Sequence, residues 1–449
     1  MDTTTSTDRE GHSRRDFLKS STAVVGAGMA AQLLVPKLAH ADGAGGATLK
    51  VGLIGCGGRG AGAAQNVVQA DEDCQLVAIA DAFDDRIQER RSKMAQASER
   101  LIVADEMCFS GFDAYRQLLA TDVDVIILAT PPHFRPEHFR AAIEAGKHVF
   151  MEKPVAVDAP GVRQVIETAK QAQQSNRCVG VGLQRRHQLH YREAISRLKD
   201  GAIGDVILSR VYWNGGGVWV RGRASLEKRY GRPITEMEYQ MRNWYYFNWL
   251  CGDHIVEQHI HNLDVVNWLK DGFPVEANGM GGREVRKGKD HGEIFDHHFV
   301  EFTYADGSKM MSQCRHIRDC WNSVSEHFHG TRGTARLSHD YRYARIDGDE
   351  AWRYSGESPN PYLVEHQDLF AAIRSGSPYN EAEYGAKSTM TAIFGRMATY
   401  SGKSLLWDEA INSDISLSPK QYDFQATPPV VPDAEGNYPI PVPGVTRVV

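Results

Sequence analysis

Two short segments carry side chains that can move a proton to or from a hydroxyl group. Glu152 and Lys153 directly follow an apolar strand predicted over His148–Met151. Glu257 and His261 lie four residues apart, and at that spacing two side chains share one face of a helix. A carboxylate one turn from an imidazole orients the ring and stabilises its protonated form. We therefore expect Lys153 and His261 to transfer protons and Glu257 to orient His261, the alternative being an ordinary polar helix face.

A glycine-rich turn, GCGGRG, follows the apolar run from Leu49 to Ile54. It matches the G-x-G-x-x-G pattern of dinucleotide-binding domains, in which the first glycine permits a tight turn and the second admits a pyrophosphate. The third glycine lets the following helix pack on the strand, and the bare amides at its N-terminus hold the phosphates. The residues expected to contact a dinucleotide here are Gly55, Gly57, Gly58, Arg59 and Gly60.

Asp81 ends the second apolar run. A carboxylate at this place accepts hydrogen bonds from a ribose 2′-hydroxyl and repels a 2′-phosphate, so the sequence favours NAD over NADP. Arg86 leaves NADP open, because a guanidinium can pair with the extra phosphate.

Further candidates lie at the ends of later strands, since ligands of parallel sheets bind at the carboxyl edge. Arg185 and Arg186 follow the fifth strand and can reach hydroxyls or an acidic group of a substrate. Tyr245 and Tyr246 have flat faces that suit the C–H face of a sugar ring, although they also suit the core of a second domain. The other predicted cofactor contacts are Thr130, Pro131, His133, Glu152, Lys153 and Gln184, and Asp264 is a predicted substrate contact.

A metal site competes for some of the same residues. His254, Glu257, His259 and His261 are ligand types that zinc accepts. Their spacing matches neither H-E-x-x-H nor H-x-x-E-H, and residues 259 and 261 face different sides of a helix. The sequence therefore predicts no metal.

The elements that would position these residues form two patterns. Strand and helix alternate from Leu49 to about Leu183, which predicts a parallel sheet covered on both faces. After a strand over Val206–Trp213 the sequence predicts a long loop rich in Gly and Arg, and then a helix from about Asp253 to Leu269. Several strands follow, and Asp306-Gly307 is a hairpin signal between two of them. We predict an α/β chain with a Rossmann domain over 49–185 and an α+β domain with a mostly antiparallel open sheet over 186–424. Six prolines make 425–449 an extended arm, either around a partner subunit or across its own surface.

The N-terminus has the parts of an export signal. Arg14 and Arg15 precede a Gly- and Ala-rich apolar run that is too short for a membrane span of about 20 residues. Ala39-His40-Ala41 is a small-x-small cleavage site. We expect a twin-arginine signal peptide over 1–41, a linker over 42–48 and a periplasmic or otherwise exported protein.

Charge and cysteine content narrow the partners. The net charge is −6, and removal of the leader makes it −7, which argues against nucleic acid and anionic membranes. The seven cysteines form no C-x-x-C pair and no disulfide framework. We expect a carbohydrate substrate, no membrane span and a homo-oligomer.

GCGGRG, the ATPPH stretch ending at His133 and Glu152-Lys153-Pro154 together resemble the Gfo/Idh/MocA family, which includes glucose–fructose oxidoreductase and inositol dehydrogenase. GTRGT, beginning at Gly330, matches a late turn of that family. The family pairs its lysine with Asp-x-x-x-His on a second-domain helix, and Glu257 stands here where the family usually has Asp. The resemblance implies oxidation of a sugar hydroxyl with NAD.

Export adds one condition, because NAD is not supplied outside the cytoplasm. An exported enzyme must retain its cofactor and restore it within the site. Three readings stay open: a sugar oxidoreductase, a redox-neutral NAD-dependent glycoside hydrolase or lyase that passes through a keto-sugar, and a non-catalytic sugar-binding relative.

Overall fold

A computed structural model describes residues 47–338 and 343–449. The predicted signal peptide over 1–41 and most of the linker lie outside the described residues. None of the helices in the described ranges combines the length and the apolar character that a membrane span requires.

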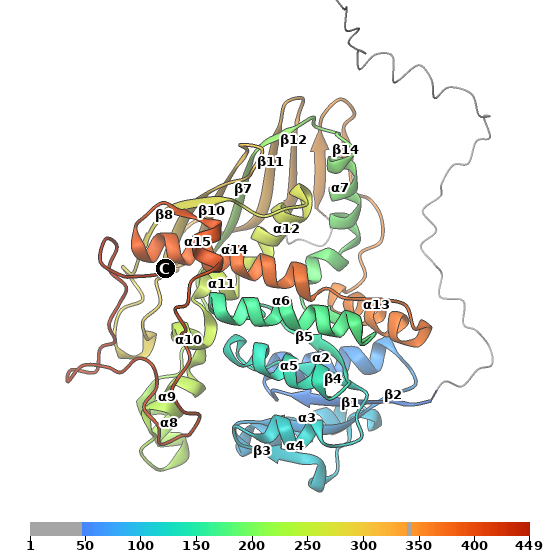
Figure 1. Ribbon diagram of the computed structural model, residues 1–449, viewed down its shortest axis with the longest axis vertical. Coiled ribbons are helices and arrows are strands. Elements are labelled where there is room, and N and C mark those ends of the chain that lie inside the picture. The colour runs from blue at the N-terminus through green and yellow to red at the C-terminus, as the bar shows by residue number, and fades with distance from the viewer. Residues whose placement is uncertain (1–46, 339–342) are drawn as a thin grey trace, which may run out of the picture. The chain divides into compact units, whose positions relative to one another are not determined.

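The N-terminal sheet has six parallel strands in the order β3-β2-β1-β4-β5-β6 (Figure 1). Its central strand β4 (Val125–Leu128) is buried along its whole length, because helices cover both faces of the sheet. This confirms the predicted Rossmann-like fold. The other strands are β1 (Leu49–Ile54), β2 (Cys74–Asp81), β3 (Cys108–Ser110), β5 (His148–Met151) and β6 (Val179–Val181).

Helices follow the strands in the predicted alternation. The Asp158 side chain accepts a hydrogen bond from the backbone N–H of Gly161 and so caps α6 (Ala159–Gln174), which has Pro160 in its first turn. The helix α13 (Pro361–Ser375) comes from late in the chain and packs against α2. The remaining helices of this part are α2 (Gly58–Ala70), α3 (Asp84–Ala97), α4 (Ala114–Leu119) and α5 (Arg135–Glu144).

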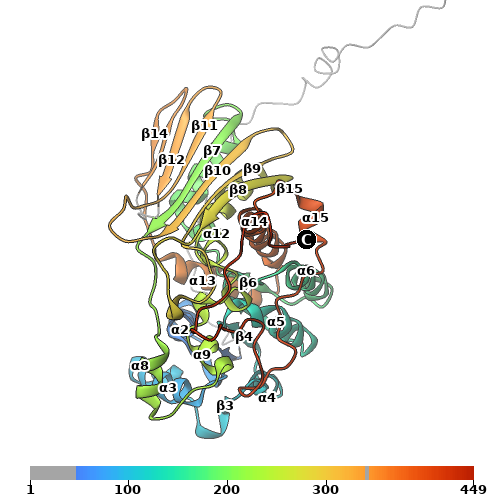
Figure 2. The ribbon, with the colours of Figure 1, turned by 90° about the vertical axis from the view of Figure 1, so that its left-hand side faces the viewer.

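The second sheet has nine strands in the order β14-β13-β12-β11-β7-β10-β9-β8-β15. Its pairs are antiparallel except β7 with β10, which confirms the predicted mostly antiparallel sheet (Figure 2). The strands are β7 (Val206–Gly215), β8 (Glu276–Gly282), β9 (His297–Thr303), β10 (Lys309–His316), β11 (Ser323–Gly330), β12 (Thr334–Ser338), β13 (Ala344–Asp347), β14 (Trp352–Arg353) and β15 (Leu405–Leu406).

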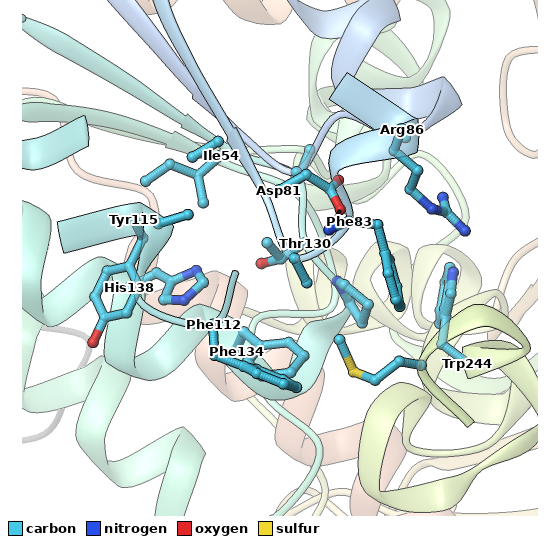
Figure 3. A pocket seen from close by; sticks show the side chains of 18 of the residues that line it. Ile54, Asp81, Phe83, Arg86, Phe112, Tyr115, Thr130, Phe134, His138 and Trp244 are labelled. Atoms are coloured by element: carbon cyan, nitrogen blue, oxygen red, sulfur yellow. Dashed lines mark hydrogen bonds between the residues drawn. The ribbon is translucent and has the colours of Figure 1, made fainter. Parts of the chain in front are cut away.

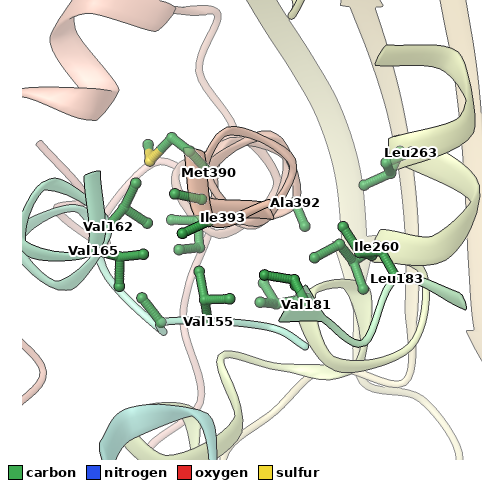
Figure 4. Close-up of a cluster of buried hydrophobic side chains, with 14 of the residues drawn as sticks. Val155, Val162, Val165, Val181, Leu183, Ile260, Leu263, Met390, Ala392 and Ile393 are labelled. Atoms are coloured by element: carbon green, nitrogen blue, oxygen red, sulfur yellow. The ribbon is translucent and has the colours of Figure 1, made fainter. Parts of the chain in front are cut away.

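One helix joins the cores of the two sheets. Met390 and Ile393 of α14 (Ala382–Ser401) are buried beside Val162 of α6 and Ile260 of α12 (Ile260–Lys270) (Figure 4). Burying such a side chain stabilises the fold by about 1.5–3 kcal/mol, so this shared core fixes the two sheets against each other. The flanking helices are α7 (Leu189–Lys199) and α15 (Trp407–Ile411).

Two segments extend beyond the sheets. The segment over 216–247, here called the wall segment, contains α8 (Arg223–Tyr230) and α9 (Glu236–Arg242), where the sequence predicted a long loop. It leads into α10 (Asn248–Cys251) and α11 (His254–Glu257). Residues 412–449, here called the strap, run along α9 without regular helix or strand (Figure 1). Gln240 donates to the Val430 carbonyl oxygen at 2.7 Å, so the arm crosses the surface of its own chain.

Candidate functional site

The glycine-rich turn has the geometry that a dinucleotide requires. Gly55 has a φ of 102°, which favours glycine, and a Cβ on Gly60 would lie 2.0 Å from the Gly55 carbonyl oxygen. Gly57 is the N-cap of α2 without a side-chain cap, and a Cβ there would meet nothing within 4 Å. The first amides of α2 therefore face open space with the positive end of the helix dipole behind them.

Asp81 is fixed at the end of β2 by the turn itself. Its Oδ2 accepts from the Cys56 N–H at 2.8 Å and its Oδ1 from the Phe83 N–H at 3.0 Å. Burial raises the pKa of this carboxyl group. Arg86 lies in the first turn of α3 and lines the same cavity as Asp81. The two side chains that would distinguish NAD from NADP therefore lie in one cavity.

A cavity of about 300 Å³ lies at this edge of the sheet. The sheet side includes Gly57, Asp81 and Thr130, and Trp244 of the wall segment lies opposite them (Figure 3). Trp219, Arg221 and Met241 complete the opposite side. The cavity therefore lies between two parts of the chain that are far apart in the sequence, which is where ligand sites commonly form.

Arg242 ties the wall segment to the Rossmann domain. Its guanidinium donates to Asp85 at 3.0 and 3.3 Å and lies 3.9 Å from the centre of the Phe83 ring. The Tyr230 hydroxyl donates to the same aspartate at 2.8 Å. The Arg242 side chain is 5% exposed, so this link is screened less than a surface pair.

The strap crosses the outer side of the cavity. Phe424 stacks on Phe83 with ring centres 5.2 Å apart and lies 4.7 Å from Phe112, and both of these rings line the cavity. The Tyr422 hydroxyl lies 2.7 Å from His133 Nε2. The wall segment thus lines the side of the cavity opposite the sheet, and the strap packs on two rings of the lining.

Lys153 reaches from the Rossmann domain to the second domain. Its Nζ donates to the backbone carbonyl oxygen of Glu257 and to Oε1 of the same residue at 3.2 Å. The two side chains are 11% and 10% exposed. Burial raises the pKa of Glu257, while the lysine opposes that shift. The structure thus places two of the three predicted catalytic residues in direct contact.

The helix predicted over Asp253 to Leu269 is broken after Glu257. α11 ends at Glu257 and α12 begins at Ile260, so the i, i+4 relation to His261 is lost. The carboxylate is directed at Lys153, and the His261 ring stacks on Trp213 with centres 5.8 Å apart.

Residues 49–183 match the sequence model of the family described as "Oxidoreductase family, NAD-binding Rossmann fold", GFO_IDH_MocA. Over these residues the chain is similar to the nucleotide-binding domains of that family. Inositol 2-dehydrogenase of Agrobacterium fabrum is 25% identical over 340 residues, which are 74% of this chain and 87% of that protein. 2,7-Anhydro-N-acetylneuraminate hydratase of Mediterraneibacter gnavus is 26% identical over 226 residues, 48% of this chain and 51% of that protein. The solved structure of levoglucosan dehydrogenase with NADH and levoglucosan has a TM-score of 0.63 at 17% identity, over 80% of this chain and 99% of that one.

NAD is the cofactor of this Rossmann domain, and the buried polar atoms fit it. Thr130 Oγ1 and Gln184 Oε1 are buried and have no hydrogen-bond partner among the described residues. Such groups are costly unless a ligand or water satisfies them. Tyr245 Oη and Glu257 Oε2 are two further buried oxygens for which residues 47–338 and 343–449 supply no hydrogen bond.

The other predicted cofactor residues either line the cavity or form contacts with other parts of the protein. The Arg59 guanidinium forms an ion pair with the buried carboxylate of Glu152 and also lines the cavity. Pro131 and Gly58 line the cavity as well. His133 instead faces the strap, and burial lowers its pKa to about 4.

Most predicted substrate residues form contacts in the interior. Arg185 is 1% exposed and forms an ion pair with Glu326, so the structure gives it a partner other than the substrate predicted for it. Arg186 holds Asp264 through several hydrogen bonds, the shortest at 2.8 Å. The Tyr246 hydroxyl accepts from Arg286 and packs inside the second domain. The Tyr245 hydroxyl lies near Glu257 and has no hydrogen-bond partner among the residues that the structure describes.

Sequence reasoning missed the second side of the cavity. Trp219, Arg221, Met241 and Trp244 lie in a segment that was expected to be a loop, and Phe424 lies in the proline-rich tail. The many aromatic residues near position 245 were the one available signal, and they were assigned to a sugar rather than to the cofactor cavity.

Proposed function

We propose that this protein is an exported oxidoreductase that acts on a hydroxyl of a sugar or sugar derivative and keeps its NAD bound between turnovers. The observation that carries the proposal is the contact of Lys153, at the end of β5, with Glu257 of the second domain. This pair joins the edge of an NAD-binding sheet to the domain whose relatives include dehydrogenases of polyhydroxylated rings.

Each side chain has a distinct task in this proposal. Bound NAD supplies the chemistry of taking up and returning a hydride. The Lys153 ammonium hydrogen-bonds the substrate hydroxyl and takes part in moving its proton. Glu257 holds the lysine through Oε1 and has Oε2 left for a substrate hydroxyl, as judged from the described residues. His261 remains the proposed second proton carrier.

Cofactor retention is supported by the enclosure of the cavity. Release of a bound dinucleotide requires the wall segment to separate from α3, which breaks the contacts of Arg242 with Asp85. It also requires Phe424 to leave Phe83. Export itself rests on the leader sequence, and replacing Arg14 and Arg15 by lysines should keep the protein in the cytoplasm if that leader is read.

The full-length purified protein tests the proposal without added cofactor. Aldoses, polyols and anhydrosugars should produce an absorbance of reduced nicotinamide that is limited to one equivalent per chain, or a paired oxidation and reduction of two sugars. Lys153→Met should abolish both signals while the protein keeps its NAD. A turnover unchanged by this substitution would remove Lys153 from the mechanism, and a requirement for added NAD would refute retention.

A redox-neutral reaction is the second candidate. A cofactor that stays bound favours a reaction cycle in which NADH is oxidised back to NAD within the same site. One relative of the chain is a hydratase, a type of enzyme that causes no net oxidation. Aryl glycosides distinguish the two candidates. Release of phenol without reduced nicotinamide supports the hydrolase or lyase, and sugar oxidation without release of phenol rejects it.

A further inference from the structure

A fully buried cluster of one carboxylate and two imidazoles lies where α11 begins beside β9. Asp253, His254 and His298 are each 0–3% exposed as whole residues. Asp253 Oδ1 lies 2.9 Å from His254 Nδ1 and 3.2 Å from His298 Nε2. We propose that these three side chains bind one divalent transition-metal ion, and the ligand set of two imidazoles and a carboxylate favours Zn²⁺.

The hydrogen bonds around His298 fix its tautomer and show that a nitrogen lone pair faces the Asp253 carboxylate. Thr399 Oγ1 donates its only proton to the Arg396 carbonyl oxygen at 3.0 Å. The same oxygen must therefore accept from His298 Nδ1, which lies 2.9 Å away. Neutral His298 then carries its hydrogen on Nδ1 and presents a lone pair at Nε2. A lone pair 3.2 Å from a carboxylate oxygen is repelled unless a cation lies between them.

Asp253 Oδ1 accepts from the backbone N–H of His254 as the N-cap of α11, and its second lone pair can face the cation. Oδ2 accepts from the Phe295 N–H at 3.0 Å and from the Tyr400 hydroxyl at 2.5 Å. The His254 ring is close to Oδ1, yet neither of its nitrogens makes a hydrogen bond within the described ranges. Ligands that lie 2.0–2.1 Å from a zinc ion are about 2.9–3.4 Å apart, and the two measured separations fall in this range.

The backbone of Asp253 is consistent with a functional constraint. Its φ of 75° is rare outside glycine, and such strain persists where the surroundings fix the residue. The sequence alone predicted no metal because only a helical set was considered, and His298 comes from a strand. His259 Nε2 lies 2.8 Å from Ser312 Oγ, and the His261 ring stacks on Trp213, so both of these side chains have other neighbours than the cluster.

The position of the ion suggests a positioning role. Asp253 caps the short helix that ends at Glu257, and His298 belongs to β9, the third strand from one edge of the second sheet. An ion between them would hold the Glu257-bearing helix against the sheet. Its loss should therefore lower the melting temperature and displace the partner of Lys153.

Elemental analysis of the full-length protein tests the site. After equilibration with Zn²⁺ and gel filtration we expect one ion per chain in the wild type and none in His298→Ala. His297→Ala is the matched control, because His297 is the preceding residue of the same strand, is half-exposed and should leave the zinc content unchanged. Equal zinc in the wild type and in His298→Ala, or zinc in neither, would overturn the proposal and leave a shared proton between His298 and Asp253.

Cobalt provides a readout that does not depend on the variants folding. Co²⁺ added to the wild-type protein should produce visible absorption bands of a nitrogen- and oxygen-bound ion, with an end point at one ion per chain and reversal by excess Zn²⁺. A titration that produces no such bands would contradict the site even if His298→Ala cannot be purified.

Discussion

Arg242→Met tests whether the wall segment retains the cofactor. The substitution keeps the apolar stem and removes the donors to Asp85. Breaking a buried ion pair costs about 3–5 kcal/mol, but the Asp85 side chain is 36% exposed, which reduces the expected loss to about 1–3 kcal/mol. Since 1.4 kcal/mol corresponds to a factor of ten, the wall segment should open about 5- to 150-fold more often.

The assay is the release of NAD from the purified protein into an enzymatic trap, followed over time. If the cofactor leaves only from the open state, its dissociation rate should rise by the same factor. Arg374→Met is the matched control, because Arg374 pairs with Asp71 at 2.8 and 2.9 Å but does not line the cavity. Equal release rates in the two variants, or an unchanged rate in Arg242→Met, would refute the clamp.

Two further predictions concern the turn and the strap. Gly60→Ala should lower the melting temperature and abolish NAD binding, because its Cβ would lie 2.0 Å from the Gly55 carbonyl oxygen. Gly57→Ala should keep the melting temperature of the wild type and lose only affinity for NAD, because its Cβ would meet nothing within 4 Å. Equal melting temperatures of the two variants would contradict this reasoning. NAD release should accelerate as the pH falls from about 6.5 towards 4. Burial lowers the pKa of His133 to about 4 in the closed state, so protonation of this ring favours the open state over that pH range. The closed state should lose about 2 kcal/mol at pH 5, and His133→Gln should remove this part of the pH dependence.

The Rossmann domain could be predicted well because its signals are local. β5 begins and ends at the residues that the apolar run indicated, since a strand buried on both faces is apolar throughout. Gly55 and Asp81 meet at the cavity because strand ends of a parallel sheet share one edge. The resulting prediction of NAD required no knowledge of the second domain.

The remainder of the site depends on packing that no local pattern encodes. The prediction for Glu257 and His261 was argued from one continuous helix, whereas the helix breaks after Glu257 and the carboxylate contacts Lys153. α8 and α9 are so polar that they resemble a loop, and they are held by contacts such as Arg242 with Asp85. Arg185 was predicted to contact a substrate, and no local pattern could pair it with its buried partner Glu326, which is far away in the sequence.

The NAD content of the protein tests the central claim most directly. Full-length protein, purified without added cofactor and then heat-denatured, should release close to one NAD per chain. Empty protein that binds added NAD rapidly and reversibly would contradict the account, because the enclosure by Arg242 and Phe424 would then not retain the cofactor.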